Sequence, residues 1–392
     1  MIHIIDIILF VWTAFSVVYV SVFAIASLFA SRHPSRKSTQ TDTVRPNFLI
    51  LIPAYAEDKV IISTARAALA QEYDSSFTVC VIADHLQPST LDALKAMPME
   101  VCEVHFADST KGKALHEAMK QYYKPQTHTH IVILDADNII HPDFLERLAG
   151  YCTNDVVAIQ AHRCAKNMDT PVAVLDALSE EINNSIFRLG HNRLGLSSAL
   201  IGSGMCFRAE WFAAIAARLE TAGEDKELER HLLFEGHKVV YVPDLDVLDE
   251  KVSDSSNFGK QRRRWLAAQF FTLRQMLRFL PQAICRGRIN YIDKTIQQAL
   301  IPRSLLIAQV IVLTLISTIL TITLDDYCGA VKWWVLTGVL FVSLLCAVPR
   351  TMYRRNLYKA FCKLPALICR MFSSLLHVRG ASHKYIHTQH SK

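Results

Sequence analysis

Asp135 and Asp137 are the residues of this sequence that are best placed to do chemistry, because they directly follow an apolar run. The run, 131–134, is rich in β-branched side chains, which predicts a strand buried on both faces. Ionised carboxylates at the end of such a strand are costly unless a cation or hydrogen bonds compensate them. In open α/β sheets, ligands bind at the carboxyl ends of the strands. Carboxylate oxygens are also the ligands that Mg²⁺ and Mn²⁺ prefer. The pair predicts a divalent metal site, with a plain Asx turn as the alternative.

Two polar groups further along the chain favour the metal interpretation. The pair Glu224 and Asp225 offers a carboxylate that can take a proton from an attacking hydroxyl, although an acidic helix N-terminus explains Glu224 equally well. The segment 261–265 reads QRRRW. A guanidinium in it can clamp phosphate oxygens, and its indole can stack on a sugar.

The segments around these residues alternate between strand and helix patterns. This alternation predicts an α/β domain with a mainly parallel sheet covered on both faces. The predicted strands are 48–52, 77–82, 101–106, 131–134, 155–160 and 238–242, and the predicted helices are 60–70, 90–96, 113–122 and 172–188.

Three apolar stretches predict membrane spans at 4–30, 303–324 and 333–349. A cleaved signal peptide fits the first stretch poorly, because no basic residue precedes it and its apolar part is too long. Basic residues flank the spans in the linker 31–46 and around residues 286–303 and 350–355. The positive-inside rule therefore places the catalytic domain, 47–257, in the cytoplasm, with the chain crossing the inner (plasma) membrane several times.

Two further segments combine basic and apolar residues, as helices lying in a membrane interface do. They are 258–300, which includes the QRRRW segment, and 350–392, in which 356–378 is an interfacial helix or, alternatively, a fourth span. The net charge of +6 is modest and gathers beside the apolar stretches, so anionic lipid explains it better than nucleic acid. The ten cysteines form no CxxC pair, which favours reduced core residues over a metal or disulfide framework.

The ordered set of these motifs resembles the membrane-bound branch of family 2 glycosyltransferases, which contains cellulose, hyaluronan and poly-N-acetylglucosamine synthases. The resemblance runs from about residue 47 to residue 269 and implies a GT-A type nucleotide-sugar-binding domain. Residues 53–57, PAYAE, match the family's opening P-A-Y-N-E pattern with Ala56 where asparagine is usual. Residues 223–225, GED, match its T-E-D motif with glycine for threonine, and 261–265 match QxxRW.

The resemblance implies a role for each matching residue. Asp137 would be the direct metal ligand, supported by Asp135, and Asp225 would be the general base beside Glu224. Gly204 and Trp265 would lie on the acceptor side. Contacts with the nucleotide sugar are implied for Pro53, Tyr55, Glu57, Asp84, Lys113, Asp135, Gln261 and Arg264.

The implied activity is an inverting, metal-dependent transfer of a sugar from a UDP-sugar donor to a growing β-linked glycan or a lipid-linked acceptor. Mg²⁺ or Mn²⁺ would be the cofactor, and membrane lipids would surround the spans. The sequence leaves a homo-oligomer or export partners open. It also leaves open two alternatives: a single-addition transferase acting on a polyprenyl phosphate, and a non-catalytic membrane scaffold.

Overall fold

The protein is described by a computed structural model over residues 2–29, 45–219, 223–251, 255–324 and 329–354, with side chains except those of 2, 255–267 and 354. An eight-stranded sheet runs in the order β3-β2-β1-β4-β7-β6-β8-β5. Only β7 and β5 oppose the other strands, since both form antiparallel pairs with their neighbours. The predicted mainly parallel α/β fold is therefore confirmed. The strands are β1 (Phe48–Tyr55), β2 (Phe77–Asp84), β3 (Glu100–Val104), β4 (His130–Ile133), β5 (Ile139–Ile140), β6 (Ala158–Ala165), β7 (Met205–Arg208) and β8 (Val239–Asp249).

Helices cover both faces of this sheet because the side chains of its central strands alternate between them. In β1, Phe48, Ile50 and Ile52 join the core beneath α2 (Ile61–Leu69), α3 (Pro88–Lys95) and α5 (Phe144–Ala149). Leu49 and Leu51 point the other way, into the core beneath α4 (Lys111–Tyr122), α8 (Ala209–Ala216) and α9 (Glu224–Glu235).

The helix predicted at 172–188 changes its winding part-way along. It begins as α6 (Pro171–Asn183), continues as a π-helix at Asn184–Gly190 and ends in α7 (His191–Arg193). A Cβ on Gly190 would lie 2.2 Å from the carbonyl oxygen of Phe23, so only glycine lets the backbone of the N-terminal helix approach this closely. The strand predicted at 155–160 is also displaced, since β6 begins at Ala158 and runs to Ala165.

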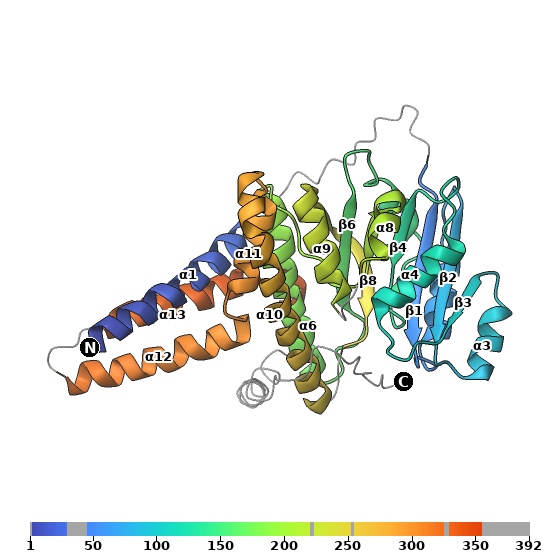
Figure 1. The fold of residues 1–392 in the computed structure, drawn as a ribbon. Coiled ribbons are helices and arrows are strands. Elements are labelled where there is room, and N and C mark those ends of the chain that lie inside the picture. The colour runs from blue at the N-terminus through green and yellow to red at the C-terminus, as the bar shows by residue number, and fades with distance from the viewer. Residues whose placement is uncertain (1, 30–44, 220–222, 252–254, 325–328, 355–392) are drawn as a thin grey trace.

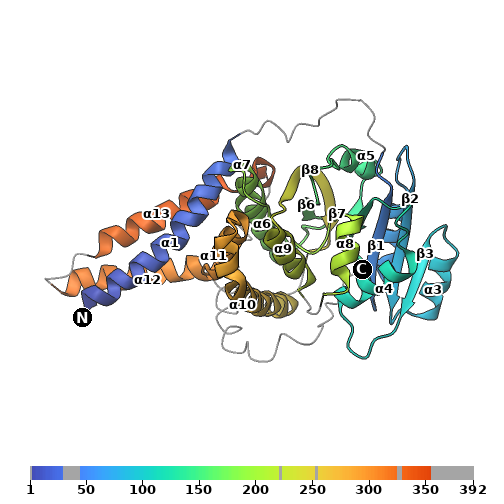
Figure 2. The same cartoon turned by 45° about the horizontal axis from the view of Figure 1, so that its top comes forward.

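Three apolar helices extend away from the sheet as a bundle: α1 (Ile2–Leu28), α12 (Arg303–Thr323) and α13 (Ala330–Cys346) (Figures 1 and 2). Two of them, α1 and α12, are long and apolar enough to cross a membrane, whereas α13 is shorter. Large apolar side chains are exposed along all three, including Trp12, Ile319 and Val335. Between the bundle and the sheet lie α10 (Ser255–Cys285) and α11 (Ile289–Ala299), which occupy the predicted interfacial region (Figure 1). The predicted segment 356–378 lies outside the described residues.

Polar contacts fix the helices of the bundle against one another. Asp6 of α1 forms an ion pair with Lys332 of α13 and accepts a hydrogen bond of 2.7 Å from the indole nitrogen of Trp333. Two further side-chain hydrogen bonds, each 2.8 Å long, join α12 and α13 to α1: Gln309 to Thr13, and Ser343 to Ser21.

The other end of α1 is joined to the α/β domain by a buried polar cluster. The Tyr19 hydroxyl donates to Asp293 of α11 at 2.8 Å and lies 3.0 Å from His191 Nε2. The ring of Phe23 stacks on His191 with centroids 3.6 Å apart. The bundle is therefore attached through specific contacts rather than through the chain connection alone.

Candidate functional site

The two aspartates of the opening motif lie on a turn that immediately follows β4. The amide of Leu134 donates to Leu51 at 3.1 Å and continues the sheet by one residue. The backbone N–H of Asp135 then donates to Asn138 Oδ1 at 2.9 Å, and the Asn138 N–H returns to the Asp135 carbonyl at 3.1 Å. Residues 135–138 thus form a hydrogen-bonded β-turn that carries both carboxylates at the end of the strand.

A third carboxylate, which the sequence analysis missed, lies beside this turn. The side-chain amide of Asn138 donates to Asp137 Oδ1 at 3.3 Å and to Asp249 Oδ1 at 3.2 Å. The backbone N–H of Glu250 also donates to Asp137 Oδ2 at 3.1 Å. Asp249 ends β8, a strand that was predicted to stop at residue 242. Asp135, Asp137 and Asp249 thus bring carboxylate oxygens, the donors that Mg²⁺ and Mn²⁺ prefer, to the same region of the structure.

Lys111, at the first position of α4, is the cation at the centre of the site. Its amine bonds to Asp135 Oδ1, donates to the Gly202 carbonyl at 2.7 Å and lies 3.5 Å from Glu224 Oε1. Burial opposes its charge, but Asp135 and Glu224 outweigh burial and raise the pKa of Lys111. Lys113, the lysine predicted to face the diphosphate, is exposed and donates to the Asp108 carbonyl at 2.8 Å instead.

Glu224 and Asp225 begin α9 and lie on the same side of the sheet edge as Lys111. Glu224 is buried, and burial raises its pKa to about 7, with Lys111 opposing the shift and the charges of Asp225 and Asp135 adding to it. Asp225 is more open, with 21% of its side chain exposed, and its Oδ1 accepts the N–H of Lys226 at 2.8 Å. The pair therefore offers one buried carboxyl that titrates near neutral pH and one carboxylate open to a reactant.

The glycine-rich segment 202–204, which precedes β7, lines the site beside Lys111 and Glu224. Gln160 is fully buried and fixes the backbone of this segment, donating to the Ser203 carbonyl at 2.9 Å and accepting the Ile201 N–H at 3.1 Å. Gly202, with a φ of +87°, would place a Cβ near only Glu224 Oε1, 3.8 Å away, so it opens into the site. Gly204, which was predicted to face the acceptor, packs against Val247, where a Cβ would come within 3.0 Å.

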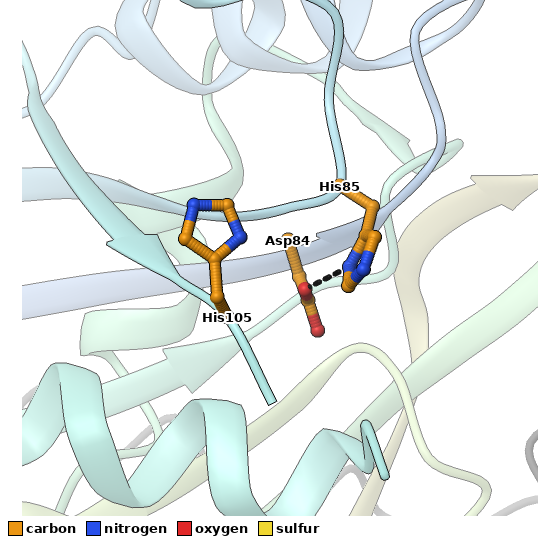
Figure 3. Close-up of side chains that lie close together, drawn as sticks. All are labelled: Asp84, His85 and His105. Atoms are coloured by element: carbon orange, nitrogen blue, oxygen red, sulfur yellow. Dashed lines mark hydrogen bonds and ion pairs between the residues drawn. The ribbon is translucent and has the colours of Figure 1, made fainter. Parts of the chain in front are cut away.

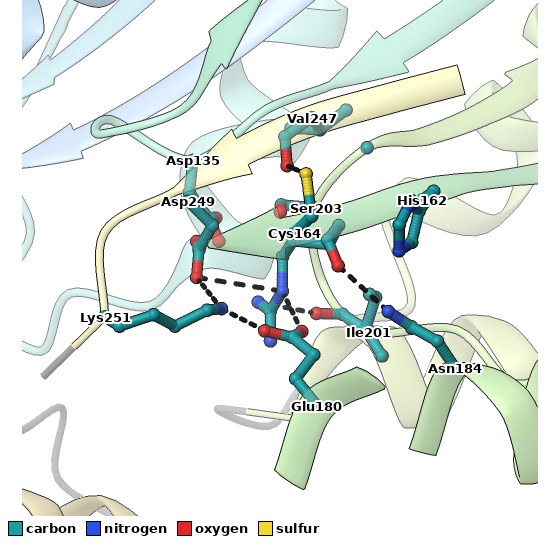
Figure 4. A network of polar contacts seen from close by, with 12 residues as sticks. Asp135, His162, Cys164, Glu180, Asn184, Ile201, Ser203, Val247, Asp249 and Lys251 are labelled. Atoms are coloured by element: carbon teal, nitrogen blue, oxygen red, sulfur yellow. Dashed lines mark hydrogen bonds and ion pairs between the residues drawn. The ribbon is translucent and has the colours of Figure 1, made fainter. Parts of the chain in front are cut away.

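A buried charge network supports the carboxylates from the side of α6 (Figure 4). Arg163 Nε donates to Glu180 Oε1 at 2.6 Å, and Lys251 bonds to Glu180 and, at 2.7 Å, to Asp249 Oδ2. Burial would raise the pKa of Glu180, but Arg163 and Lys251 hold it well below its usual range. Because Asp249 contacts both Asn138 and Lys251, this network fixes the third carboxylate relative to Asp137.

The predicted nucleotide-contacting residues gather at the ends of β1 and β2. Tyr55 and Asp84 are register partners, and the Ala56 N–H donates to the Asp84 carbonyl at 2.9 Å. Ala56 has a φ of 53°, a left-handed conformation that asparagine tolerates better than alanine. The Glu57 carbonyl accepts the N–H of Ile61 at 3.1 Å and so begins α2. Pro53 lies within β1, in register with Ile82.

The QxxRW residues lie on α10, and their side chains are outside those that the structure describes. Of the predicted residues with described side chains, Asp135, Asp137, Glu224 and Asp225 occupy one sheet edge. Sequence reasoning missed Lys111 as the central cation, Arg163 and Glu180 as supports, and Asp249. Asp249 could have been predicted as a carboxylate at a strand end, but only if the strand had been predicted to run to residue 249 instead of ending at residue 242.

Comparison with known proteins bears on more than half of the chain. Residues 46–268 match the family model described as Glycosyltransferase like family 2. A "Probable glucomannan 4-beta-mannosyltransferase 1" of Arabidopsis thaliana is 25% identical over 247 residues, which cover 59% of this chain and 44% of the relative. The "Probable glucomannan 4-beta-mannosyltransferase 11" of the same plant is 24% identical over 245 residues, covering 59% and 55%. The chain spans about half the length of these curated relatives.

A solved structure has a similar fold over most of this chain. It is a mannosyltransferase from Pyrobaculum calidifontis, determined in complex with GDP-Man and Mn²⁺. The TM-score is 0.54 with 16% sequence identity, covering 88% of this chain and 97% of that chain. This likeness supports the GT-A-like arrangement of sheet and helices.

Proposed function

Because the chain belongs to the glycosyltransferase-like family 2, we propose that it is a membrane-embedded transferase that moves a sugar from a nucleotide sugar to a glycan or lipid-linked acceptor with inversion. The observation that carries the proposal is the meeting of Asp135 and Glu224 at the amine of Lys111. These residues come from separate motifs, and the fold brings them to one sheet edge. A non-catalytic scaffold would not require this arrangement, in which the buried Glu224 is held beside Asp135 and needs a cation to offset the cost of its burial.

In the proposed reaction the nucleotide lies over the ends of β1 and β2, near Tyr55 and Asp84, with its diphosphate toward Asp135 and Asp137. Lys111 restrains the Asp135 carboxylate and supplies positive charge beside the phosphates. Asp225 takes the proton of the acceptor hydroxyl as it attacks the anomeric carbon from the face opposite the leaving group. Glu224, the neighbour of Asp225, positions the amine of Lys111 through its contact with it.

Asp135 and Asp137 would hold the metal, and Asp249 offers a further carboxylate beside them through Asn138. A bound Mg²⁺ or Mn²⁺ would neutralise charge on the departing nucleoside diphosphate, a contribution of several kcal/mol. Asn138 keeps two of these carboxylates in place whether or not a cation is present, because it donates to both.

The helical bundle supports the membrane part of the proposal. With α1 entering the membrane from outside and α12 and α13 forming a hairpin, the ends that carry Asp6 and Lys332 lie at the same membrane face, as their ion pair requires. The exposed apolar side chains of α1, α12 and α13 would contact lipid. The sheet edge with the carboxylates then lies on the cytoplasmic side, where nucleotide sugars are available.

The test is release of nucleoside diphosphate by the detergent-purified full chain, with Mg²⁺ or Mn²⁺ and a panel of donors. UDP-sugars are included because the motif set implies UDP, and GDP-mannose because the curated relatives are named as mannosyltransferases. Asp225→Asn should keep donor binding and lose turnover, whereas Glu227→Gln, a change in the same helical turn, should keep both.

Turnover with one donor that requires metal and disappears in Asp225→Asn would support the proposal. Turnover that survives in Asp225→Asn would remove this residue as the base. A folded sample that neither binds nor turns over any donor would contradict the transferase assignment.

A further inference from the structure

Two histidines flank the carboxylate of Asp84 at the carboxyl ends of β2 and β3 (Figure 3). His85 follows β2 directly, and His105 follows β3, which pairs with β2 in parallel register. The Asp84 oxygen lies 2.5 Å from His85 Nδ1, and one ligand atom from each of the three residues lies within 4.8 Å of the other two. The two imidazole rings stand nearly perpendicular, with centroids 5.9 Å apart.

We propose that Asp84, His85 and His105 form a binding site for a transition-metal cation of the Zn²⁺ type, separate from the carboxylate site of Asp135 and Asp137. Two imidazoles and one carboxylate form a ligand set that Zn²⁺ commonly takes, whereas Mg²⁺ prefers oxygen ligands. Three protein ligands would leave one tetrahedral position open. The two histidine side chains are exposed, so modest rotations can bring their nitrogens to bonding distance from a shared ion.

The local backbone supports a ligand role for His85. Its φ of 58° places it in the left-handed region, which non-glycine residues adopt at a cost and which marks functional positions. This conformation turns the ring back toward Asp84 instead of along the strand direction (Figure 3). The Asp84 side chain is only 5% exposed, and a cation would compensate the burial of its charge better than one imidazole does.

The other group of this kind among the described residues consists of His162, Cys164 and Asp246, and the ring nitrogens of its histidine are already engaged. Both ring nitrogens of His162 already lie against carboxylates, at 2.8 Å from Asp246 and 3.1 Å from Glu181. This histidine is explained by its two partners, whereas His105 stands beside a carboxylate that His85 already contacts.

If the nucleotide binds as in the proposed function, a cation at Asp84, His85 and His105 would compete with its base. Tyr55 lies against His85, with ring centroids 5.3 Å apart, where the nucleotide base is proposed to bind. A cation held by Asp84 would then occupy part of the base position. Zn²⁺ would compete with the nucleotide, while Mg²⁺ would assist its binding at the other site.

The test is Zn²⁺ binding by calorimetry and Co²⁺ binding by visible absorption, using the detergent-purified full chain in excess Mg²⁺ to occupy the carboxylate site. One ion per chain should bind, with the visible absorption of tetrahedral Co²⁺. His105→Ala should weaken binding by roughly tenfold or more, since it removes one of three ligands. His85→Asn should weaken Zn²⁺ binding to a similar extent, and asparagine is chosen because it tolerates the left-handed backbone of this position. His141 is another exposed histidine, and His141→Ala should leave Zn²⁺ binding unchanged.

Absence of stoichiometric binding, or binding that is unaltered in both His105→Ala and His85→Asn, would overturn the site. A separate titration of UDP with and without Zn²⁺ tests the consequence: Zn²⁺ should weaken UDP binding in the wild type and not in His105→Ala. Zn²⁺ binding with unchanged UDP affinity would support the metal site and contradict the placement of the base. Failure of nucleotide turnover in Mg²⁺ alone would count against the transferase and leave the metal measurement intact.

Discussion

Asp135 and Glu224 both contact one amine, that of Lys111, which bonds to the first and lies 3.5 Å from the second. The aspartate follows a central strand and the glutamate begins a helix of the other half of the domain. Through this lysine the predicted metal-binding turn and the predicted base-bearing helix are held at a fixed separation. The charges of Lys111 and Asp135 therefore act on the buried Glu224, which leads to the first two predictions.

Lys111→Met should destabilise the protein by about 3 kcal/mol, because the buried Glu224 and the partly exposed Asp135 would both lose their cation. The measurement is the free energy of unfolding in detergent by chemical denaturation. Lys113→Met provides the matched control, since this side chain is exposed and should change stability by less than about 0.5 kcal/mol. Equal losses in the two variants would contradict the central role of Lys111.

Glu224→Gln should flatten the pH dependence of stability between about pH 4.5 and 7. The folded pKa of about 7 exceeds the ordinary 4.5, so the folded protein binds a proton that the unfolded chain does not hold in this window. Stability of the wild type should consequently fall as the pH rises through it. Melting temperatures at pH 5 and pH 8 measure the effect, and a wild-type difference no larger than that of Glu224→Gln would refute it.

His162→Gln should destabilise the protein at pH 6 by about 2 kcal/mol and by much less at pH 10. Burial lowers the pKa of His162, but Asp246 and Glu181 outweigh burial and raise it from 6.5 to about 9. The stabilisation from this raised pKa is complete below about 6.5 and is lost as the pH rises through 9. Melting curves from pH 6 to 10 follow it, with His116→Gln on α4 as the control. A loss that does not depend on pH would exclude the charged histidine.

Ala56→Asn should raise the free energy of unfolding by up to about 1 kcal/mol, because asparagine tolerates the left-handed backbone of this position better than alanine. The control is Ala54→Gly in β1, two residues before Ala56: because this alanine is buried in an extended strand, glycine should lower the free energy of unfolding by about 1 kcal/mol. Chemical denaturation of both variants gives the two signs. Destabilisation by Ala56→Asn would show that the left-handed φ carries no cost here.

Parts of the fold could be predicted from the sequence because they depend on local patterns. The apolar runs that became β1, β2 and β4 bury both faces, and the turn at Asp135 follows from the chemistry of its own side chains. Longer-range features were missed. The predicted helix becomes a π-helix at Asn184, and this π-helix ends at Gly190, where the backbone of Phe23 approaches; no local pattern encodes that contact.

Periodicity and composition are local properties, so the sequence was sufficient to place Asp84, Asp135 and Asp137 at strand ends and to identify the motifs that accompany them. Which side chains meet depends instead on how distant segments pack. Lys111 and Lys113 look equivalent in the sequence, but two residues are about 200° apart on a helix, so one faces the carboxylates and the other faces solvent. Asp249, Arg163 and Glu180 joined the site for the same reason: strand order and helix packing bring together residues that the chain keeps far apart.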